Sequence, residues 1–332
     1  KLILINLLFI GSLFSQDYYY SKYAPFDDDI LSPEEFLGYP IGEMHTRHDL
    51  IVSYMEYLSD SSDKAKIFYY GKTYEKRKLL ILAISSPEKI VDIEKIRDSH
   101  ISYIDPEHPN YNSNKKPDDF PVIINLAYNV HGNEPSSSEA ALLTAYTLVS
   151  SQSDEINKYL NESIILIDPT INPDGRDRHT HWANTYKGSP LVDDPQDAEH
   201  NEYWPGGRTN HYWFDLNRDW YLGIHPESRG KLNWYHKWQP NVTTDFHEMG
   251  SNSTYFFVPF KPNGSLNPVI PKENYDYFNF LFGSYYAKAL DDIGTLYFTR
   301  EIFDRTYPGY GSSYPDYLGG IGILFEQASS RG

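Results

Sequence analysis

Two short segments of uninterrupted apolar character constrain the fold of this chain more than any other feature. They are PVIINLAY, residues 121–128, and SIILID, residues 163–168. Strands that are apolar on both faces occur in parallel sheets that helices cover on both sides. Between the two segments, residues 135–150 place apolar side chains at helical spacing and begin with a proline, which suits a first helical turn. The pattern therefore predicts a strand–helix–strand unit.

The remaining apolar segments continue this alternation along the chain. They predict helices within 45–58 and 275–290, strands at 67–70 and 79–84 around a turn at Gly71, and strands near 242–246, 255–259 and 321–325. No repeat or linker divides the 332 residues. We therefore predict an α/β fold: a single domain with a central mixed, mostly parallel β-sheet covered by helices on both faces. Residues 172–220 predict a long irregular segment, which in a compact domain is usually functional.

Composition excludes several classes of function. Lysine and arginine total 29 and acidic residues total 46, so the net charge is −17 at pH 7 with histidine neutral. A field of this sign repels a phosphate backbone, which argues against a nucleic-acid partner. The absence of cysteine excludes a disulfide framework, a thiolate metal site and a cysteine nucleophile. Any transition metal would be bound by His, Asp and Glu, a ligand set that suits catalytic zinc.

The N-terminus carries a further apolar run, LILINLLFIGSLF, at residues 2–14. A membrane-spanning helix needs about 20 apolar residues, so this run is too short to span and fits an export signal cut near Ser15. The alternative is a buried N-terminal strand or helix. We therefore expect a signal peptide at 1–15, a leader that wraps the domain at 16–40, and a catalytic domain at 41–332. Export would make the protein secreted or periplasmic, without a membrane span.

Polar residues gather where predicted strands end. His131 and Glu134 follow the strand at 121–128, and His247 follows the strand near 242–246. Side chains at the carboxyl ends of parallel strands meet in the crevice where ligands bind. Two ligands close in sequence and a third far away are common at catalytic zinc sites that keep a position open for water. Taken singly, each of these residues is more often an ordinary loop or core residue, so the hypothesis depends on the three together.

Two other polar groups suit a peptide substrate. Asn217 and Arg218 lie next to each other in FDLNRD, and a guanidinium binds a carboxylate through a planar pair of hydrogen bonds. Glu326 ends the apolar run IGILF, where a carboxylate is costly unless it is paired or serves as a base. An ordinary ion pair is the alternative for both Arg218 and Glu326. Glu248 is a second candidate base. Because it is next to His247 in the sequence, its side chain would point away from the metal ligands.

Five motifs in this order resemble the carboxypeptidase A-like zinc metallocarboxypeptidases, above all their large exported bacterial members. The motifs are HGNE at 131–134, INPDG at 171–175, FDLNRD at 214–219, TDFHE at 244–248 and LFE at 324–326. The resemblance runs from about residue 45 to the end of the sequence. It implies one zinc ion per chain, bound by His131, Glu134 and His247. It also implies that Asn217 and Arg218 bind the terminal carboxylate of the substrate and that Glu326 is the general base.

The resemblance does not settle which arginine and which tyrosine of this sequence match two residues of the family. The family's domain also extends beyond the last residue of this sequence. The family has an arginine after NPDG that polarises the scissile carbonyl, and here Arg176 is preferred, with Arg178 as the alternative that contacts substrate. The family also has a mobile tyrosine before the catalytic glutamate, for which Tyr307 fits best and Tyr310 is second. Only six residues follow Glu326 where the family continues with a helix, so we expect a domain truncated at its C-terminus.

The predicted function is zinc-dependent hydrolysis of the C-terminal peptide bond of peptides or proteins, with metal-activated water and a glutamate base. The alternative is a zinc amidase or deacylase acting on cell-wall peptides or small acyl-amino acids, since such enzymes share the ligand set. The pair Asn217 and Arg218 favours peptide C-termini. A binding module without activity would be expected to lack Glu326 or a ligand, and all four residues are present. The oligomeric state is not indicated.

Overall fold

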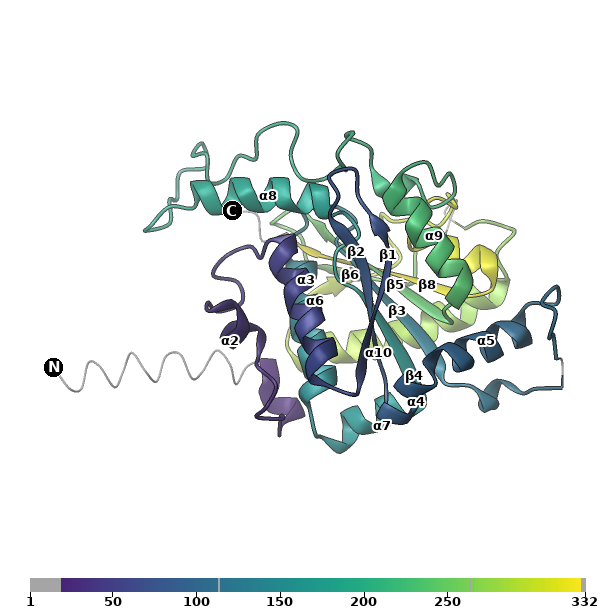
Figure 1. Cartoon of the computed structure of the whole chain (residues 1–332). Coiled ribbons are helices and arrows are strands. Elements are labelled where there is room, and N and C mark those ends of the chain that lie inside the picture. The colour runs from purple at the N-terminus through teal and green to yellow at the C-terminus, as the bar shows by residue number, and fades with distance from the viewer. Residues whose placement is uncertain (1–18, 113, 263, 265, 330–332) are drawn as a thin grey trace.

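The structure is a computed structural model that describes residues 19–112, 114–262, 264 and 266–329, so the predicted signal peptide at 1–15 lies outside the described residues. The described residues form an eight-stranded sheet with the order β1-β2-β4-β3-β5-β8-β6-β7. The strands are β1 (Ala65–Lys72), β2 (Lys78–Ile84), β3 (Val122–Tyr128), β4 (Ser163–Asp168), β5 (Val242–Met249), β6 (Tyr255–Phe257), β7 (Tyr297–Phe298) and β8 (Ile321–Ala328). Figure 1 shows the sheet between helices.

The centre of the sheet is parallel and its flanks are mixed. The neighbours β4, β3, β5 and β8 all run in the same direction, whereas β2 and β6 join them antiparallel. This arrangement confirms the predicted mixed, mostly parallel sheet. The carboxyl ends of β3, β5 and β8 consequently lie at one edge, and the register of β5 and β8 places His247 opposite Glu326.

Helices cover both faces of the sheet (Figure 1). The α-helices are α2 (Pro33–Leu37), α3 (His48–Ser61), α4 (Pro87–Val91), α5 (Ile93–Ile104), α6 (Ser136–Ser150), α7 (Asp154–Glu162), α8 (Pro173–Tyr186), α9 (Pro226–Trp238) and α10 (Asn279–Asp292). Shorter helical turns are η1 (Ser21–Tyr23), η2 (Pro117–Asp119), η3 (Leu216–Arg218), η4 (Asn274–Phe278) and η5 (Tyr314–Leu318).

Alternate residues of the central strands enter two different hydrophobic cores. Leu80 and Leu82 of β2 pack with residues of α3 and α6, whereas Ile81 and Ala83 of the same strand pack with Trp234 of α9. A third cluster joins β6 and β8 to α10. Because successive side chains of a strand point to opposite faces, a strand that is apolar throughout must be covered on both sides. The continuous apolar runs of the sequence therefore reflect this three-layer arrangement.

Two local predictions differ from the structure. The strands β1 and β2 pair antiparallel, but the chain reverses between Lys72 and Lys78 rather than at the predicted turn, and Gly71 lies at an irregularity within β1. Residues 172–220 are not irregular throughout, because α8 occupies 173–186. Asn172 caps this helix by accepting a hydrogen bond from Gly175 N, and Pro173 takes its first position. The helix was not predicted because polar residues dominate it.

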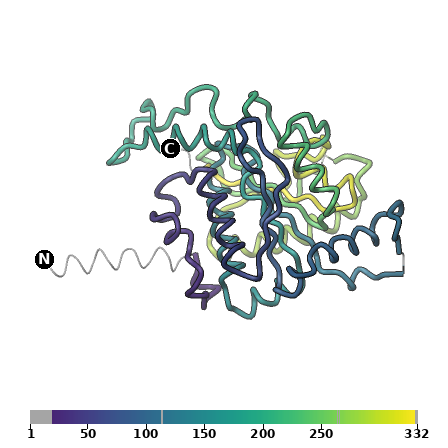
Figure 2. The backbone as a smooth tube through the Cα atoms, in the orientation of Figure 1, coloured from purple at the N-terminus to yellow at the C-terminus, as the bar shows by residue number. Residues whose placement is uncertain are grey.

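The described residues before α3 pack on the domain, and Figure 2 shows them alongside α3. The ring of Tyr146 in α6 is stacked on Phe26 and contacts Tyr20 edge-on, with both centroids 5.2 Å away. Tyr54 Oη of α3 donates a hydrogen bond to Leu31 O at 3.0 Å. The boundary between leader and domain at residue 40 stays a prediction.

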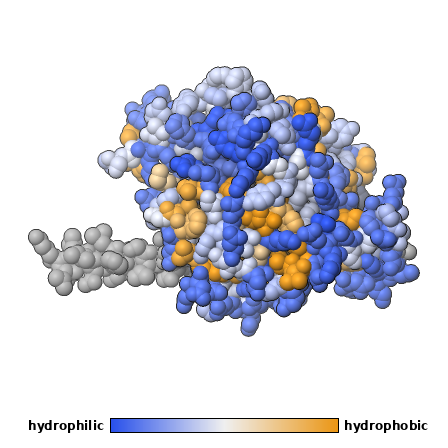
Figure 3. Space-filling model, in the orientation of Figure 1, coloured by the Kyte–Doolittle hydropathy of each residue, from blue (hydrophilic) through white to orange (hydrophobic). Residues whose placement is uncertain are grey.

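The surface is polar over most of the face drawn in Figure 3, with apolar residues in separate patches. Within the described segments, no helix combines the length and the apolar character that crossing a membrane requires.

A buried ion pair joins α9 to the sheet. Lys231 Nζ lies 2.7 Å from Asp168 Oδ2 at the end of β4, and both side chains are buried. Tyr70 Oη donates to the same oxygen at 3.0 Å, and the Lys231 ammonium lies 4.9 Å from the centre of the Trp234 ring. Burial raises the pKa of Asp168, while the charge of Lys231 opposes that rise. Removing only one of the two partners would therefore leave a buried, unpaired charge and destabilise the fold.

We predict that Lys231→Met destabilises the domain by about 3–5 kcal/mol, because the Asp168 carboxylate is left without its cation. The free energy of unfolding in denaturant measures this change. Lys237→Met, at an exposed position of the same helix, should change stability by less than about 0.5 kcal/mol. Equal stability of the two variants would contradict the role assigned to the pair.

Candidate metal centre and active site

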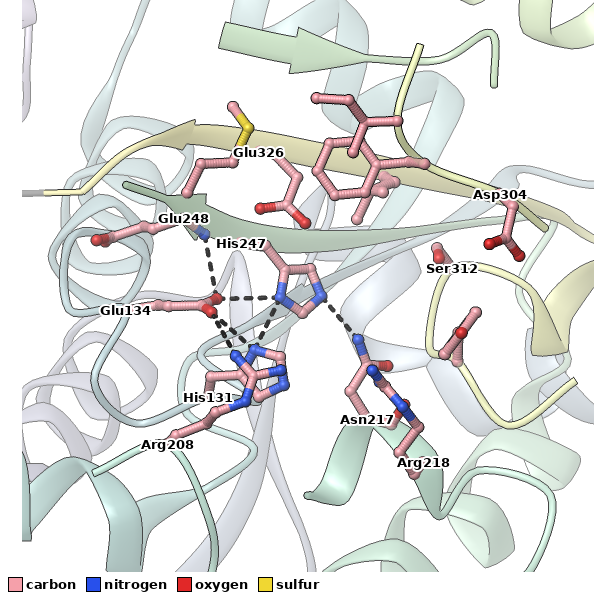
Figure 4. A pocket seen from close by; sticks show the side chains of 15 residues that line it. His131, Glu134, Arg208, Asn217, Arg218, His247, Glu248, Asp304, Ser312 and Glu326 are labelled. Atoms are coloured by element: carbon pink, nitrogen blue, oxygen red, sulfur yellow. Dashed lines mark hydrogen bonds and ion pairs between the residues drawn. The ribbon is translucent and has the colours of Figure 1, made fainter. Parts of the chain in front are cut away.

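Two side chains that are three positions apart, His131 and Glu134, meet a third from more than a hundred residues further on, His247, at the carboxyl edge of the sheet (Figure 4). His131 Nδ1 lies 2.8 Å from Glu134 Oε1, His247 Nδ1 lies 3.0 Å from Glu134 Oε2, and the two Nδ1 atoms are 3.2 Å apart. All three residues are buried and form a group that could hold one metal ion. The structure thus brings together the three residues predicted as ligands.

The outer nitrogens of both histidines have polar neighbours that fix the rings. His131 Nε2 lies 2.9 Å from Asp215 Oδ1, and His247 Nε2 lies 2.9 Å from Asp245 Oδ2. Such neighbours are typical of histidine ligands, because they orient the ring and leave the other nitrogen for the metal. Two imidazole nitrogens and one carboxylate are a ligand set that zinc accepts with a coordination position left open. The residues present therefore fit zinc.

The loop after β3 holds His131 and Glu134 in place through Asn129. This buried residue has a left-handed backbone, with φ of +58°. Its Nδ2 donates hydrogen bonds to the carbonyl oxygens of both His131 and Glu134, each at 2.9 Å. Asparagine is one of the few residues that tolerate this backbone conformation. Sequence reasoning missed Asn129, although a polar residue directly after an apolar strand was the available signal.

The two candidate bases point in different directions (Figure 4). Glu326 lines the pocket, next to His247 in the register of β5 and β8. Burial raises the pKa of the Glu326 carboxyl to about 7, a range that suits a group which accepts and returns a proton. Glu248 Oε1 instead accepts a hydrogen bond from Ser136 N at 2.7 Å, at the start of α6. Glu248 therefore points away from the ligand cluster, as its position next to His247 predicted.

Arg176 does not reach the pocket, so its predicted role of polarising the scissile carbonyl is wrong. Arg176 belongs to the first turn of α8, and its side chain is fully buried. It donates from Nε to Thr46 O at 2.9 Å, from Nη1 to Pro135 O at 2.7 Å and from Nη2 to Glu139 Oε1 at 2.6 Å. Because these partners occupy all three nitrogens, Arg176 joins α8 to α6 rather than facing substrate.

Arg178 is also held by the protein rather than exposed to the pocket. It donates from Nε to Gly206 O at 2.9 Å and from Nη2 to Asn210 O at 3.0 Å. These contacts fasten the loop that follows α8. Arg178 is not among the residues that line the cavity, and its Nε and Nη2 donate within the chain, so the structure does not bring it to the ligand cluster as a substrate contact.

The arginine found beside the ligand cluster is Arg208, which was not predicted. It lines the pocket, with Nη1 3.4 Å from Glu134 Oε1 and Nη2 3.0 Å from Asp215 Oδ2. Sequence reasoning missed it because the residue lies far beyond NPDG, in an irregular loop. The preceding glycine pair was the only local signal that the backbone there approaches another segment closely.

Of the two candidate tyrosines, Tyr310 is the one in the pocket. Its ring lies 4.8 Å from Arg218 Cζ, whereas Tyr307 is not among the lining residues and donates from Oη to Arg218 O at 3.0 Å. Asn217 Oδ1 accepts a hydrogen bond from Gly311 N at 2.8 Å, which joins the tyrosine loop to η3. Of the two predicted tyrosines, Tyr310 therefore lines the cavity, and Tyr307 does not.

Asn217 and Arg218 lie at the same pocket as the ligand cluster, as predicted (Figure 4). The cavity measures about 350 Å³. Arg218 Nη1 donates to Asn217 O at 2.8 Å and lies 3.9 Å from Asp215 Oδ2, a long ion pair, while Nε and Nη2 have no hydrogen-bond partner among the described residues. The guanidinium is thus available to an anionic group in the cavity.

Comparison with solved structures shows the fold. The metallo-carboxypeptidase from Burkholderia cenocepacia has a TM-score of 0.56 at 15% identity, over 84% of this chain and 60% of that chain. Carboxypeptidase A from Helicoverpa armigera has a TM-score of 0.60 at 16% identity, over 97% of this chain and 72% of that chain. The present chain thus spans about three fifths of the Burkholderia protein's length.

Comparison with sequence families gives a more direct result. No curated protein matches the sequence. A family model described as "Zinc carboxypeptidase" matches residues 51–257, which contain all three candidate ligands and the pair Asn217 and Arg218. The match covers more than half of the chain. The chain therefore belongs to the zinc carboxypeptidase family.

Proposed function

We propose that this chain is the catalytic domain of a zinc-dependent exopeptidase that hydrolyses the C-terminal peptide bond of peptides or proteins. One observation carries the proposal. A single cavity is lined by the ligand group His131, Glu134 and His247, by the guanidinium of Arg218 and by the buried carboxyl of Glu326. Family membership and the shared fold support it.

Arg218 binds the terminal carboxylate of the substrate in this proposal. Its free Nε and Nη2 present two parallel donors, which match the two oxygens of a carboxylate. Tyr310 supports the guanidinium from one face, with its ring 4.8 Å from Arg218 Cζ. A free C-terminus anchored there brings the last peptide bond toward the ligand cluster, and the last side chain toward the remaining wall of the cavity.

Zinc in this site would supply Lewis-acid chemistry, polarising a carbonyl oxygen and acidifying water. Glu326 accepts the proton of the attacking water and returns it to the amine that leaves. Arg208 stabilises negative charge on the carbonyl oxygen, since its guanidinium lies beside Glu134 at the entrance to the ligand cluster. Asp215 fixes both His131 and Arg208, and so couples their positions.

The alternative is a zinc amidase or deacylase for cell-wall peptides or small acyl-amino acids. Such enzymes use the same ligands, so the metal centre does not discriminate between the two functions. Arg218 does, because a guanidinium with Nε and Nη2 unbonded among the described residues favours a substrate with a free carboxylate. The proposal also includes export to a secreted or periplasmic location, which rests on the short apolar run at residues 2–14.

We predict that Arg218→Ala removes the preference for free C-termini. The loss of a bidentate partner costs about 2–4 kcal/mol of transition-state binding, or roughly a 30- to 800-fold lower kcat/KM for blocked dipeptides with a free acid. The same dipeptides with a C-terminal amide should hardly be affected. Arg229→Ala removes an exposed arginine of α9 and serves as the control. Wild-type enzyme that cleaves amides as well as acids would favour the amidase.

We predict that Glu326→Gln lowers kcat by about 10²–10⁴-fold while zinc content and substrate affinity stay close to wild type. Glutamine keeps the shape of the side chain but accepts no proton at neutral pH, so only the proton transfers are lost. Glu248→Gln is the matched control and should cost less than about threefold, since its carboxyl points toward Ser136. Inactivity of Glu248→Gln together with substantial activity of Glu326→Gln would show that the wrong base has been assigned.

A further inference from the structure

A residue outside the cavity joins the ligand loop, residues 131–134, to the loop that carries Arg208. This residue is Glu202, which lies six positions before Arg208 and does not line the pocket. Only 11% of its side chain is exposed. Because a buried carboxylate is costly unless hydrogen bonds compensate it, the contacts of Glu202 account for its position.

Glu202 accepts hydrogen bonds from the ligand loop, from α8 and from the Arg208 loop. Oε2 accepts from Asn133 Nδ2 at 2.7 Å, and Asn133 lies between two of the metal ligands. Oε1 accepts from Gly207 N and from His179 Nδ1 of α8, each at 2.8 Å. Burial opposes ionisation, but the hydrogen bonds from His179 and Asn133 outweigh it and lower the pKa of the Glu202 carboxyl. A charged acceptor therefore stands where the three segments meet.

The main chain is fixed on both sides of Arg208. Gly207 N, directly before it, donates to Glu202, and Arg208 O accepts from Asn172 Nδ2 at 3.1 Å. There is no room for a side chain at Gly207, because a Cβ atom there would lie 2.6 Å from His179 Cβ. The backbone from which the Arg208 side chain starts thus has a set distance from the ligand loop.

The Arg208 side chain depends on this backbone for its position. It is 46% exposed, with Nη2 3.0 Å from Asp215 Oδ2 and a longer contact of 3.4 Å between Nη1 and Glu134 Oε1 (Figure 4). A long, half-exposed side chain can adopt several rotamers, so a shift of its backbone moves the guanidinium as well. A misplacement of about 1 Å at a reacting centre can cost about 10²-fold in rate.

We propose that Glu202 is a positioning residue that holds the Arg208 guanidinium where negative charge develops on the scissile carbonyl. It acts through Gly207 N, and its partners on the ligand loop and α8 are its anchors. The inference rests on the proposed exopeptidase function, in which Arg208 stabilises that charge and Arg218 binds the terminal carboxylate. Because the charge forms only in the transition state, loss of Glu202 lowers kcat and leaves KM nearly unchanged.

The test measures kcat, KM and zinc content of the zinc-loaded protein, with a blocked dipeptide that has a free C-terminal acid. Glu202→Ala should lower kcat by about 10- to 100-fold, keep KM within about threefold and retain one zinc ion per chain. Glu202→Gln should lower kcat at least about threefold but less than Glu202→Ala, because its amide oxygen still accepts from Gly207 N. Asp193→Asn is the matched control, at an exposed acidic residue of the same segment between α8 and η3, and should leave kcat within about twofold.

The same substitutions in an Arg208→Ala background separate positioning from a general effect on the fold. Once the guanidinium is absent, Glu202→Ala should lower kcat by less than about threefold, since the group that it positions is gone. A residue that only stabilises the fold would lower kcat by the same factor in both backgrounds. If Glu202→Ala does not fold, Glu202→Gln carries the same comparison.

Equal factors in the two backgrounds, loss of zinc from Glu202→Gln, or a wild-type kcat in Glu202→Ala would overturn the inference and leave the exopeptidase function standing. An unchanged kcat in Arg208→Ala would overturn the inference as well, because there would be no effect for Glu202 to transmit. Failure of the zinc-loaded wild type to hydrolyse any blocked dipeptide with a free acid would overturn the exopeptidase function and this inference with it.

Discussion

The close approach of three backbone segments at glycines underlies the whole site. A Cβ atom at Gly132 would lie 2.2 Å from Gly175 C, and one at Gly175 would lie 2.3 Å from Gly207 O. No other residue fits at either position without movement of the backbone. This contact presses the ligand loop against the first turn of α8 and against the loop that carries Arg208. The distance between the metal ligands and the guanidinium thus follows from main-chain packing.

The parallel register of the sheet supplies the other half of the site. His131 follows β3, while β5 and β8 run beside each other so that His247 and Glu326 are opposite. Both residues therefore depend on the same hydrogen-bond ladder, and a slip of one residue would move Glu326 to the other face. The apolar cores on both sides of the sheet fix that register, because each central strand buries both of its faces.

Much of the fold and the metal centre could be predicted, because apolar periodicity and strand ends are local properties of a sequence. His131, Glu134 and His247 were found in this way, with Asn217, Arg218 and Glu326. Arg208 was not found and Tyr310 was named only as the second choice after Tyr307, because their positions depend on how irregular loops fold back. Arg176 is close to its motif along the chain but turns beneath α8, whereas Arg208 is distant along the chain and enters the pocket. Loop paths of this kind leave no periodic signal in the sequence.

The proposed activity requires one zinc ion held by the three residues at the carboxyl edge of the sheet. The most direct measurement is a crystal structure of the zinc-loaded protein, with anomalous diffraction recorded at the zinc edge. The account predicts one strong peak in contact with His131 Nδ1, the Glu134 carboxylate and His247 Nδ1. The group Glu75, Asp174 and His211 also places three ligand atoms near one another, but Arg77 already pairs with both of its acids. A peak there, with none at His131, would contradict the account.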